Sequence, residues 1–234
     1  MASKITIPDL KKIRVTDPLF SHYAGMVAKK MIPVQWEILN GKQGQSRCFC
    51  IDNFRIAGGT LQGEHRGVVF GDTDAYKWLE AVAYCANNGE TEYIPEADEL
   101  IEIIGQAQQP DGYLNTYFTV CHPELRWKNL TEGHELYSAG HLIEAAVAYY
   151  NATGKRRLLD IAAKFADLIC QTFGDGEGQI PGYPGHQEIE LALVKLWRVT
   201  GEERYLKTAR FFIDCRGRTP NYLLREMNDP NHKV

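Results

Sequence analysis

Residues 141–174 read HLIEAAVAYYNATGKRRLLDIAAKFADLICQTFG, and two different helical patterns meet in this stretch at Gly154. The first ten residues are apolar on nearly every face and carry one charged side chain, Glu144. After the glycine, apolar residues recur at helical spacing: Leu158, Ala162, Phe165 and Ile169. A helix that is apolar all round is buried on most sides, whereas a striped helix is buried on one. The stretch therefore predicts an inner helix that ends at the glycine, followed by an outer helix.

This helical hairpin is repeated along the chain. A similar turn occurs at Gly201, after the apolar stretch HQEIELALVKLW (186–197), and a looser copy occurs at Gly89, after WLEAVAYCA (78–86). Self-similar helix pairs of this kind indicate stacked hairpins. We therefore predict an all-α fold with seven main helices and little sheet, in which inner and outer helices alternate as in part of an α/α toroid.

The segment before the hairpins completes the predicted domain organisation. Residues 17–40 favour a further outer helix, in which Pro33 marks a bend or break. We divide the chain into an N-terminal segment with this helix and a loop (1–69) and a partial α/α toroid (70–234). Together the two segments are predicted to form one domain.

The composition excludes several classes of protein. The chain has 234 residues, and 26 basic against 30 acidic side chains give a net charge of −4, so nothing points to a nucleic-acid partner. No apolar run approaches the roughly 18 residues of a transmembrane helix, and the first residues lack the apolar core of a signal peptide. We therefore expect a cytoplasmic protein with no membrane partner.

The six cysteines agree with that compartment. Cys48 and Cys50 form the one close pair, with C-x-C rather than C-x-x-C spacing, and Cys85, Cys170 and Cys215 each lie in an apolar helical stretch. The favoured interpretation is a set of small buried side chains in a reducing environment. A zinc site built within this chain is the minority alternative, because no second close pair exists.

The loops between the predicted helices are unequal in length. Turns from inner to outer helices are only a few residues, whereas the connections to the next inner helix are long, near 41–75, 109–135 and 174–186. In an alternating array these long loops emerge on one face, at the N-termini of the inner helices. Loops on one face of a rigid scaffold carry function, so we expect the ligand site there.

Three groups of polar side chains belong to this expected face. They come from FGDTDAYKWLEA, NLTEGHELYSAGH and GQIPGYPGHQEIE: Asp72 and Asp74; Glu132, His134, Glu135, Tyr137 and His141; Tyr183, His186, Glu188 and Glu190. Carboxylates, imidazoles and hydroxyls together can hydrogen-bond a polyhydroxylated ligand. Two structural alternatives stay open, with Asp74 as a helix N-cap and His141 as a core histidine. His134 does not begin an H-E-x-x-H zinc motif, because position 138 is serine.

These motifs resemble one known family. DTDAYKWLEA, QQPDGYLNTYF, GHELYSAGHLIEAAVAYYNATGKRRLLD, GYPGHQEIELALVKLWRVTGEERYL and FFIDCRG, spread over 70–217, are similar to the N-terminal part of the β-L-arabinofuranosidases of glycoside hydrolase family 127. The resemblance implies a six-hairpin α/α catalytic domain, with about half of the ring present. It also implies a retaining glycosidase reaction, in which a zinc-bound cysteine thiolate attacks the anomeric carbon and a glutamic acid protonates the leaving oxygen.

The resemblance further implies the roles of particular residues. His134 and His186 match positions that contact the arabinofuranose ring, and Asp72, Glu135 and Glu188 lie in the same motifs, so these five are the predicted substrate-binding residues. Nothing in this chain matches the nucleophile or its zinc ligands, so no catalytic residue and no metal are expected here, although zinc is expected in the full-length family enzyme.

The predicted function is therefore a glycoside hydrolase of the β-L-arabinofuranosidase type, acting on non-reducing terminal L-arabinofuranosyl residues. This chain would supply sugar-binding residues without the zinc–thiolate centre, and would be inactive alone. The alternative is a non-catalytic α/α scaffold that binds sugar, or an inactive truncated remnant.

An incomplete ring has two open edges. We expect the inner helix near 186–200 to leave some of Leu193, Val194 and Trp197 partly uncovered, and the inner helix near 76–87 to be open on its other side. Because large exposed apolar patches favour association, self-association through the open edge is a predicted interaction besides carbohydrate.

Overall fold

The computed structural model describes residues 8–42 and 48–229, and in these ranges the chain is helical and contains no strand. One isolated bridge pairs Phe173 with Ile180. None of the described helices has the length and apolarity needed to span a lipid bilayer. The all-α prediction is therefore confirmed. Three stretches lie outside the described ranges: 1–7, which carries the signal-peptide expectation, 43–47 of a predicted loop, and 230–234.

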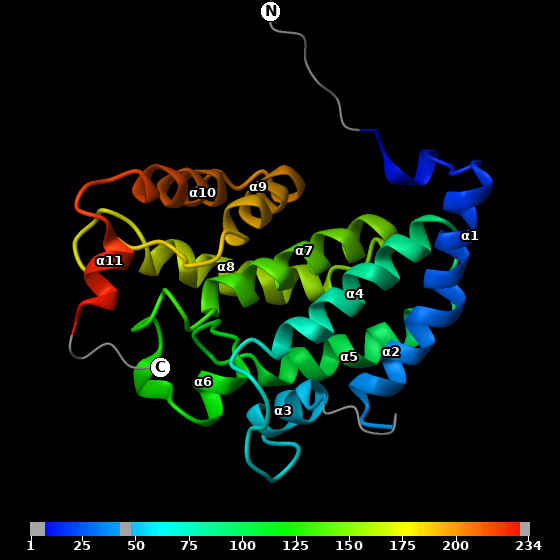
Figure 1. The fold of residues 1–234 in the computed structure, drawn as a ribbon, viewed down its shortest axis with the longest axis horizontal. Coiled ribbons are helices and arrows are strands. Elements are labelled where there is room, and N and C mark those ends of the chain that lie inside the picture. The colour runs from blue at the N-terminus through cyan, green and yellow to red at the C-terminus, as the bar shows by residue number, and fades with distance from the viewer. Residues whose placement is uncertain (1–7, 43–47, 230–234) are drawn as a thin grey trace, which may run out of the picture.

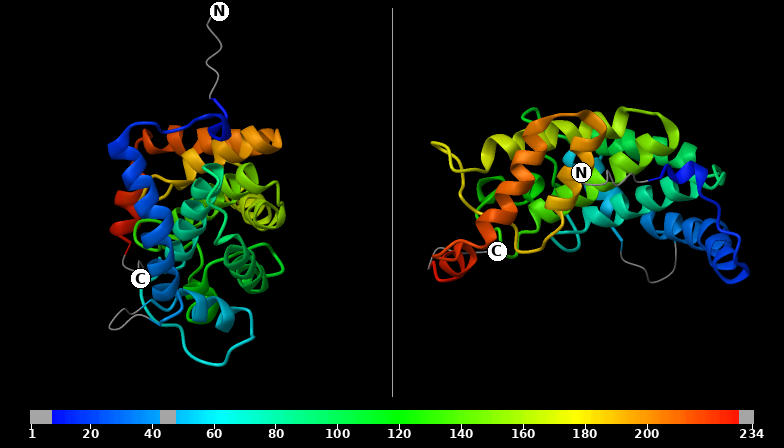
Figure 2. Two further views of the ribbon diagram at one scale, coloured as in Figure 1. Left: turned by 90° about the vertical axis from the view of Figure 1, so that its right-hand side faces the viewer. Right: turned by 90° about the horizontal axis from the view of Figure 1, so that it is seen from above.

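Six of the described helices form three consecutive hairpins (Figures 1 and 2). The inner helices are α4 (Asp72–Asn87), α7 (Glu135–Thr153) and α9 (Ile189–Thr200), and the outer helices are α5 (Ile94–Ala107), α8 (Arg157–Thr172) and α10 (Glu203–Arg216). The inner helix α7 packs between α4 and α9, and the outer helix α8 contacts α5 and α10. An inner and an outer layer that alternate along the chain make part of an α/α toroid, as predicted.

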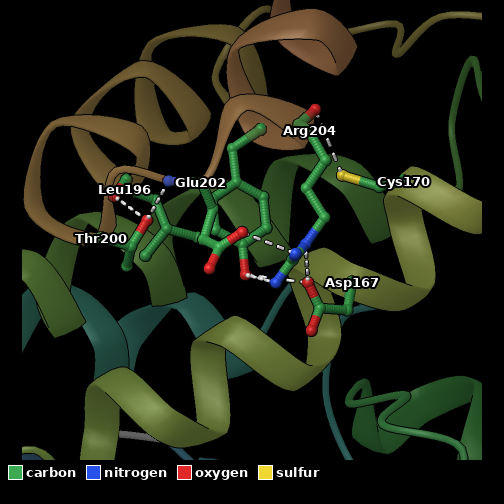
Figure 3. Close-up of polar contacts among 7 residues, drawn as sticks. Asp167, Cys170, Leu196, Thr200, Glu202 and Arg204 are labelled. Atoms are coloured by element: carbon green, nitrogen blue, oxygen red, sulfur yellow. Dashed lines mark hydrogen bonds and ion pairs between the residues drawn. The ribbon is translucent and has the colours of Figure 1, made fainter.

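Two of the three turns from inner to outer helices are built alike. Gly154 and Gly201 end α7 and α9 in the left-handed conformation, both at φ 76°, where glycine is favoured. Just before them, Thr153 and Thr200 donate their hydroxyls to the carbonyl four residues earlier (2.7 and 2.9 Å). Each hydroxyl also accepts the N–H two residues later (3.1 and 3.3 Å), and Figure 3 shows the second of these turns. The sequence repeat is thus a repeat of hydrogen bonds.

Neighbouring hairpins are joined by polar contacts between an aspartate on one outer helix and side chains of the next hairpin. Asp98 on α5 accepts hydrogen bonds from Tyr149 (2.9 Å) and from a lysine of the next hairpin. Asp167 on α8 accepts hydrogen bonds from Tyr205 (2.8 Å) and Arg204 (2.7 Å), which both lie on the outer helix α10 (Figure 3). Partly exposed pairs of this kind contribute at most about 1 kcal/mol each, so burial of the inner helices provides most of the stability.

The predicted helix over 17–40 passes through Pro33 without breaking. It consists of α1 (Pro18–Met26), a π turn (Val27–Met31) and α2 (Ile32–Leu39). In the π turn, the N–H of Ile32 bonds to the carbonyl of Val27, five residues back. A proline ring clashes with the carbonyl four residues before it, and a wider turn relieves that crowding. Of the predicted bend or break at Pro33, the break is therefore excluded, and a π turn precedes the proline.

The open edges of the partial ring differ in part from the prediction. One side of α4 is covered by α2, because Trp36 and Trp78 stack with ring centroids 4.7 Å apart. Tyr84, further along α4, is 41% exposed. On α9, Leu191 is 55% exposed, and of the three residues some of which were predicted to be partly uncovered, Leu193 is fully buried and faces the core. Two residues are only partly buried, as predicted: Val194 and Trp197.

Short helices occupy the long loops and the two ends of the described chain. They are η1 (Leu10–Lys12), α3 (Cys50–Ala57), α6 (Thr116–Val120), η3 (Pro123–Leu125) and α11 (Tyr222–Met227). The helix α3 packs against α5 and α6. Glu226 on α11 accepts the backbone N–H groups of Leu130 and Thr131 (2.8 Å each), which fixes the loop before α7. The division of the domain between residues 69 and 70 stays a prediction.

Candidate functional site

Two imidazoles meet at the loop ends of α7 and α9. His134 immediately precedes α7 at φ 55° and ψ 17°, a left-handed conformation that is uncommon for residues with a Cβ. Its Nδ1 hydrogen-bonds to the carbonyl of Glu132. His186 lies in the loop before α9, and the centroids of the two imidazole rings are 4.7 Å apart. The two histidines predicted from the sequence therefore lie within reach of one small ligand.

Tyr137 links these histidines to α4. Its ring lies edge-on to His134 and His186, with centroid distances of 5.7 and 5.6 Å. Its hydroxyl accepts a hydrogen bond from Nζ of Lys77 (2.9 Å). Phe70 also packs against His134, at a centroid distance of 5.0 Å. We call these five residues the histidine cluster.

The loop that carries His186 lies very close to the loop before α7. The N–H of Gly185 donates to the carbonyl of Leu130 (2.8 Å), and a Cβ on Gly185 would lie only 2.2 Å from the carbonyl oxygen of Thr131. Arg216, the last residue of α10, donates to the carbonyl of Pro184 (2.7 Å). Glycine is therefore required where the two loops meet, and this approach brings the imidazoles together.

His141 and Glu188 lie beside the cluster. Nδ1 of His141 is 3.5 Å from Oε1 of Glu188, and its ring lies edge-on to Tyr137 at a centroid distance of 4.5 Å. Burial, assisted by the charge of Lys77, lowers the pKa of His141 to about 4. At neutral pH the imidazole is therefore uncharged, and its contact with the carboxylate is not an ion pair. Burial and the charges of two other glutamates raise the pKa of Glu188.

Asp72 is buried at the start of α4. Its side chain accepts hydrogen bonds from the hydroxyl (2.5 Å) and the N–H (2.8 Å) of Thr116, and the residue is 1% exposed. Burial raises the pKa of this carboxyl to about 6, against the opposing effect of the bonds from Thr116. The carboxylate therefore fastens the long loop before α7 to the first turn of α4.

Glu135 has the same arrangement at the start of α7. One carboxyl oxygen accepts the hydroxyl of Tyr113 (2.5 Å) and the other accepts the N–H of Trp127 (2.8 Å), and the residue is buried. Burial raises the pKa of Glu135 to about 8, although both hydrogen bonds and Arg126 act in the opposite direction. The guanidinium of Arg126 covers the ring of Tyr113 at 3.9 Å. The carboxyls of Asp72 and Glu135 thus both hydrogen-bond to residues of the long loop before α7.

The five predicted binding residues therefore divide into two sets. The rings of His134 and His186 contact each other directly. Glu188 is connected to them indirectly, because it contacts His141, whose ring packs against Tyr137, and Tyr137 contacts both histidines. The other two, Asp72 and Glu135, are buried and hydrogen-bond to the loop before α7. Sequence patterns alone do not distinguish these sets, because the enclosing groups come from distant positions in the chain.

Three members of the cluster were not among the five predicted binding residues: Tyr137, which was named only as a candidate polar side chain, and Phe70 and Lys77, which were not named as candidates. Phe70 and Lys77 lie in the motif FGDTDAYKW, and the spacing of Lys77, three residues after Asp74 on the same helix face, was the available signal. The first residue of α4 is Asp72 and its N-cap is Gly71, so the N-cap alternative for Asp74 is wrong.

The described residues do not form a zinc site. Among them, no group of three or more His, Cys, Asp or Glu side chains could hold a metal ion. The sulfurs of Cys48 and Cys50 lie 3.5 Å apart, and Sγ of Cys48 is 3.8 Å from Oδ2 of Asp74. Zinc takes about four ligands in tetrahedral geometry. The zinc implied by the resemblance therefore does not fit the described part of this chain.

Solved structures share this architecture. A β-L-arabinofuranosidase of family GH127 from Geobacillus stearothermophilus T6 is 53% identical, with a TM-score of 0.88 over 94% of this chain and 35% of that one. A second GH127 β-arabinofuranosidase is 35% identical, with a TM-score of 0.83 over 91% of this chain and 34% of that one.

Sequence comparisons agree. The chain is 37% identical to a non-reducing end β-L-arabinofuranosidase from Bifidobacterium longum subsp. longum, over 94% of this chain and 36% of that protein. The chain thus spans about a third of the length of these relatives. The family profile described as the β-L-arabinofuranosidase GH127 catalytic domain matches residues 12–233. On this evidence the chain belongs to glycoside hydrolase family 127.

Proposed function

We propose that this chain forms the sugar-binding wall of a β-L-arabinofuranosidase that acts on non-reducing terminal L-arabinofuranosyl residues. The observation that supports this most directly is the pair of imidazoles 4.7 Å apart, with Tyr137 edge-on to both. The names of the family relatives supply the class of sugar. A furanose has hydroxyls around a small ring, so it suits a few convergent polar groups beside aromatic faces.

The hydrogen bonds of the cluster indicate how each group would meet the sugar. A carbonyl oxygen only accepts, so the contact of Nδ1 of His134 with Glu132 places the ring proton on Nδ1. Nε2 of a neutral His134 is then an acceptor for a sugar hydroxyl. The hydroxyl of Tyr137 accepts a hydrogen bond from Lys77, which leaves its own proton free to donate. The carboxylate of Glu188 adds a hydrogen-bond acceptor beside the cluster.

In this proposal Asp72 and Glu135 are positioning residues. Each holds part of the loop before α7, through Thr116 in one case and through Tyr113 and Trp127 in the other. The loop in turn sets the left-handed backbone of His134. Their effect on sugar binding would therefore be indirect, although the resemblance places them in the same motifs as the histidines.

We assign no bond-breaking role to the described residues. The retaining reaction implied by the resemblance needs a zinc-bound thiolate, and the described side chains offer no group of ligands for that metal. We therefore propose that the 234-residue chain binds the sugar and does not hydrolyse aryl β-L-arabinofuranosides by itself. Turnover by the purified chain that stops on chelation would contradict this part of the proposal.

Titration of the chain with methyl β-L-arabinofuranoside, followed by NMR or calorimetry, tests the binding site. His186→Ala is expected to weaken binding at least about tenfold, because one or two hydrogen bonds of about 1 kcal/mol each are lost along with ring contact. His122→Ala is the matched control, since that histidine is partly exposed and lies outside the cluster. Equal affinity of His186→Ala and the unmodified chain would overturn the assignment.

A further inference from the structure

Two cysteines lie side by side at the start of α3. Sγ of Cys48 is 3.5 Å from Sγ of Cys50, which is the first residue of this helix. Both are free thiols. Other thiols of the chain are placed differently, since those of Cys170 and Cys215 hydrogen-bond to backbone carbonyls. Cys48 and Cys50 therefore each have a neighbouring sulfur as a reaction partner.

The backbone between the two cysteines suits a disulfide bond. Phe49, which separates them, has φ −123° and ψ 5°, so the chain bends there instead of running extended. Two residues of extended chain span at most about 7 Å, and a disulfide takes Cα atoms about 4.4–6.8 Å apart. To reach the S–S distance of about 2.05 Å, the sulfurs must come about 1.5 Å closer. Cys48 precedes the helix, so a rotation of its side chain can supply this movement.

The two thiols differ in ionisation and in access. Hydrogen bonds with the thiol and the N–H of Cys50 lower the pKa of Cys48, against the effects of burial and of Asp74. Cys48 is partly exposed and lines a cavity of about 570 Å³, together with Asp74, Lys77 and Trp78. Cys50 is 2% exposed, and its contact with Cys48 and its burial raise its pKa well above the usual value. Because the thiolate is the attacking form, Cys48 is the sulfur that reacts first.

We propose that Cys48 and Cys50 are a dithiol that a small disulfide, of the class of oxidised glutathione, converts reversibly to an intramolecular disulfide. The thiolate of Cys48 attacks one sulfur of the small disulfide, and one thiolate of that molecule leaves. Cys50 then loses its proton to solvent and attacks Sγ of Cys48, and the second small thiolate leaves. The two cysteines together lose two electrons and two protons, and the small disulfide becomes two thiols. The proposal does not depend on the arabinofuranosidase function, because it uses no residue of the histidine cluster.

The test uses the purified 234-residue chain, reduced and then equilibrated with mixtures of reduced and oxidised glutathione. After an acid quench, the remaining thiols are alkylated and the chain is digested with trypsin. Cleavage after Arg47 and Arg55 releases the peptide CFCIDNFR (48–55), which holds these two cysteines and no other. The expected product is this peptide without alkylation and lighter by two hydrogen atoms, and dithiothreitol should restore the dithiol. Two alkylated thiols in this peptide, even after oxidised glutathione alone, would overturn the proposal.

Single variants test the order of the two steps. Cys50→Ser should retain glutathione as a mixed disulfide on Cys48, because the second thiol is missing, whereas Cys48→Ser should leave Cys50 reduced. Cys121→Ser is the matched control, since Cys121 is exposed and lies outside the pair, so oxidation of 48–55 should be unchanged. Glutathione trapped on Cys50 as readily as on Cys48 would overturn the assignment of Cys48 as the attacking sulfur.

A synthetic peptide of sequence CFCIDNFR separates the effect of the fold from that of the spacing. The fold holds the two sulfurs together, so the chain should form its disulfide at a glutathione ratio at least about tenfold more reducing than the peptide needs. Thermal unfolding of Cys48→Ser and Cys50→Ser checks that each variant is folded before the reaction. Equal oxidation of the peptide and the chain would mean that the C-x-C spacing alone is responsible, which would overturn the role assigned to the structure.

Discussion

The two ends of the inner helices differ in whether their local structure repeats from one hairpin to the next. At the turn end, Thr153 and Thr200 make the same two hydrogen bonds and are followed by glycines of the same conformation. At the loop end, the N-caps of α4, α7 and α9 have three different backbone conformations: Gly71 right-handed helical, His134 left-handed and Glu188 neither. The repeated end joins each inner helix to its outer helix, and the unrepeated end carries the side chains that we propose bind a sugar.

The largest effect is expected where two loops touch at the loop end. Gly185→Val would place a Cβ 2.2 Å from a backbone oxygen of Thr131, so the loops must separate. Overpacking of this kind costs about 3 kcal/mol at the upper end of its usual range. We expect a clear fall in melting temperature and loss of sugar binding by His134 and His186, measured by thermal unfolding and by the methyl arabinofuranoside titration.

Gly25→Ala is the control for that substitution. A Cβ at Gly25 meets nothing within 4 Å, and the residue lies within α1, so alanine should be neutral or slightly stabilising. Normal sugar binding by Gly185→Val would show that the close approach of the loops does not position the imidazoles.

A smaller effect, on the pH dependence of stability, is expected from the loop end, where Glu135 lies. Because burial raises the pKa of Glu135 to about 8 in the folded chain, against an ordinary value of 4.5, the folded state holds this proton more tightly. The associated stability is complete below the ordinary pKa and is lost as the pH rises through about 8. From pH 6.5 to 8.5 the free energy of unfolding should fall by about 2 kcal/mol, at about 1.4 kcal/mol per unit.

Glu135→Gln should abolish most of that pH dependence, since glutamine resembles the protonated acid and does not titrate. Denaturant unfolding at pH 6.5, 7.5 and 8.5 measures it. Asp72, with a pKa of about 6, affects lower pH and interferes little in this window. An equal decline in the variant and the unmodified chain would assign the pH dependence to other groups.

The difference between the ends also explains what the sequence could predict. The glycines at the turns and the apolar stripe of Leu158, Ala162 and Phe165 act locally, so they indicated the hairpins and their order correctly. At Pro33 the sequence left a bend or a break open, and a single π turn lets the helix continue. Which of Leu193, Val194 and Trp197 stays partly uncovered could not be chosen from the sequence, because it depends on how α9 is rotated against its neighbours, which the helical period alone does not set.

The site was predicted less completely, for a physical reason. Asp72 and Glu135 look like ligand-binding carboxylates in the sequence, yet Thr116 and Tyr113 occupy them from 44 and 22 residues away. Such contacts are tertiary and have no local signal. The proximity of His134 and His186 was easier to predict, because a histidine beside glycine at the start of an apolar helix is a distinctive pattern.

The smallest effect tests whether the turn end is a true repeat. Thr153→Val and Thr200→Val each remove a hydroxyl that accepts one backbone N–H, so each should cost about 1 kcal/mol in denaturant unfolding. The two losses should agree within about 0.5 kcal/mol and add in the double variant, since the turns are independent.

Thr172→Val is the matched control: its hydroxyl donates to Leu168, and no backbone N–H donates to it within the described ranges, so the loss should be smaller. If one turn loses about 1 kcal/mol and the other nothing, the two hydrogen-bond patterns are alike in geometry but not in energy, and the ring is held together by burial of its inner helices rather than by its turns.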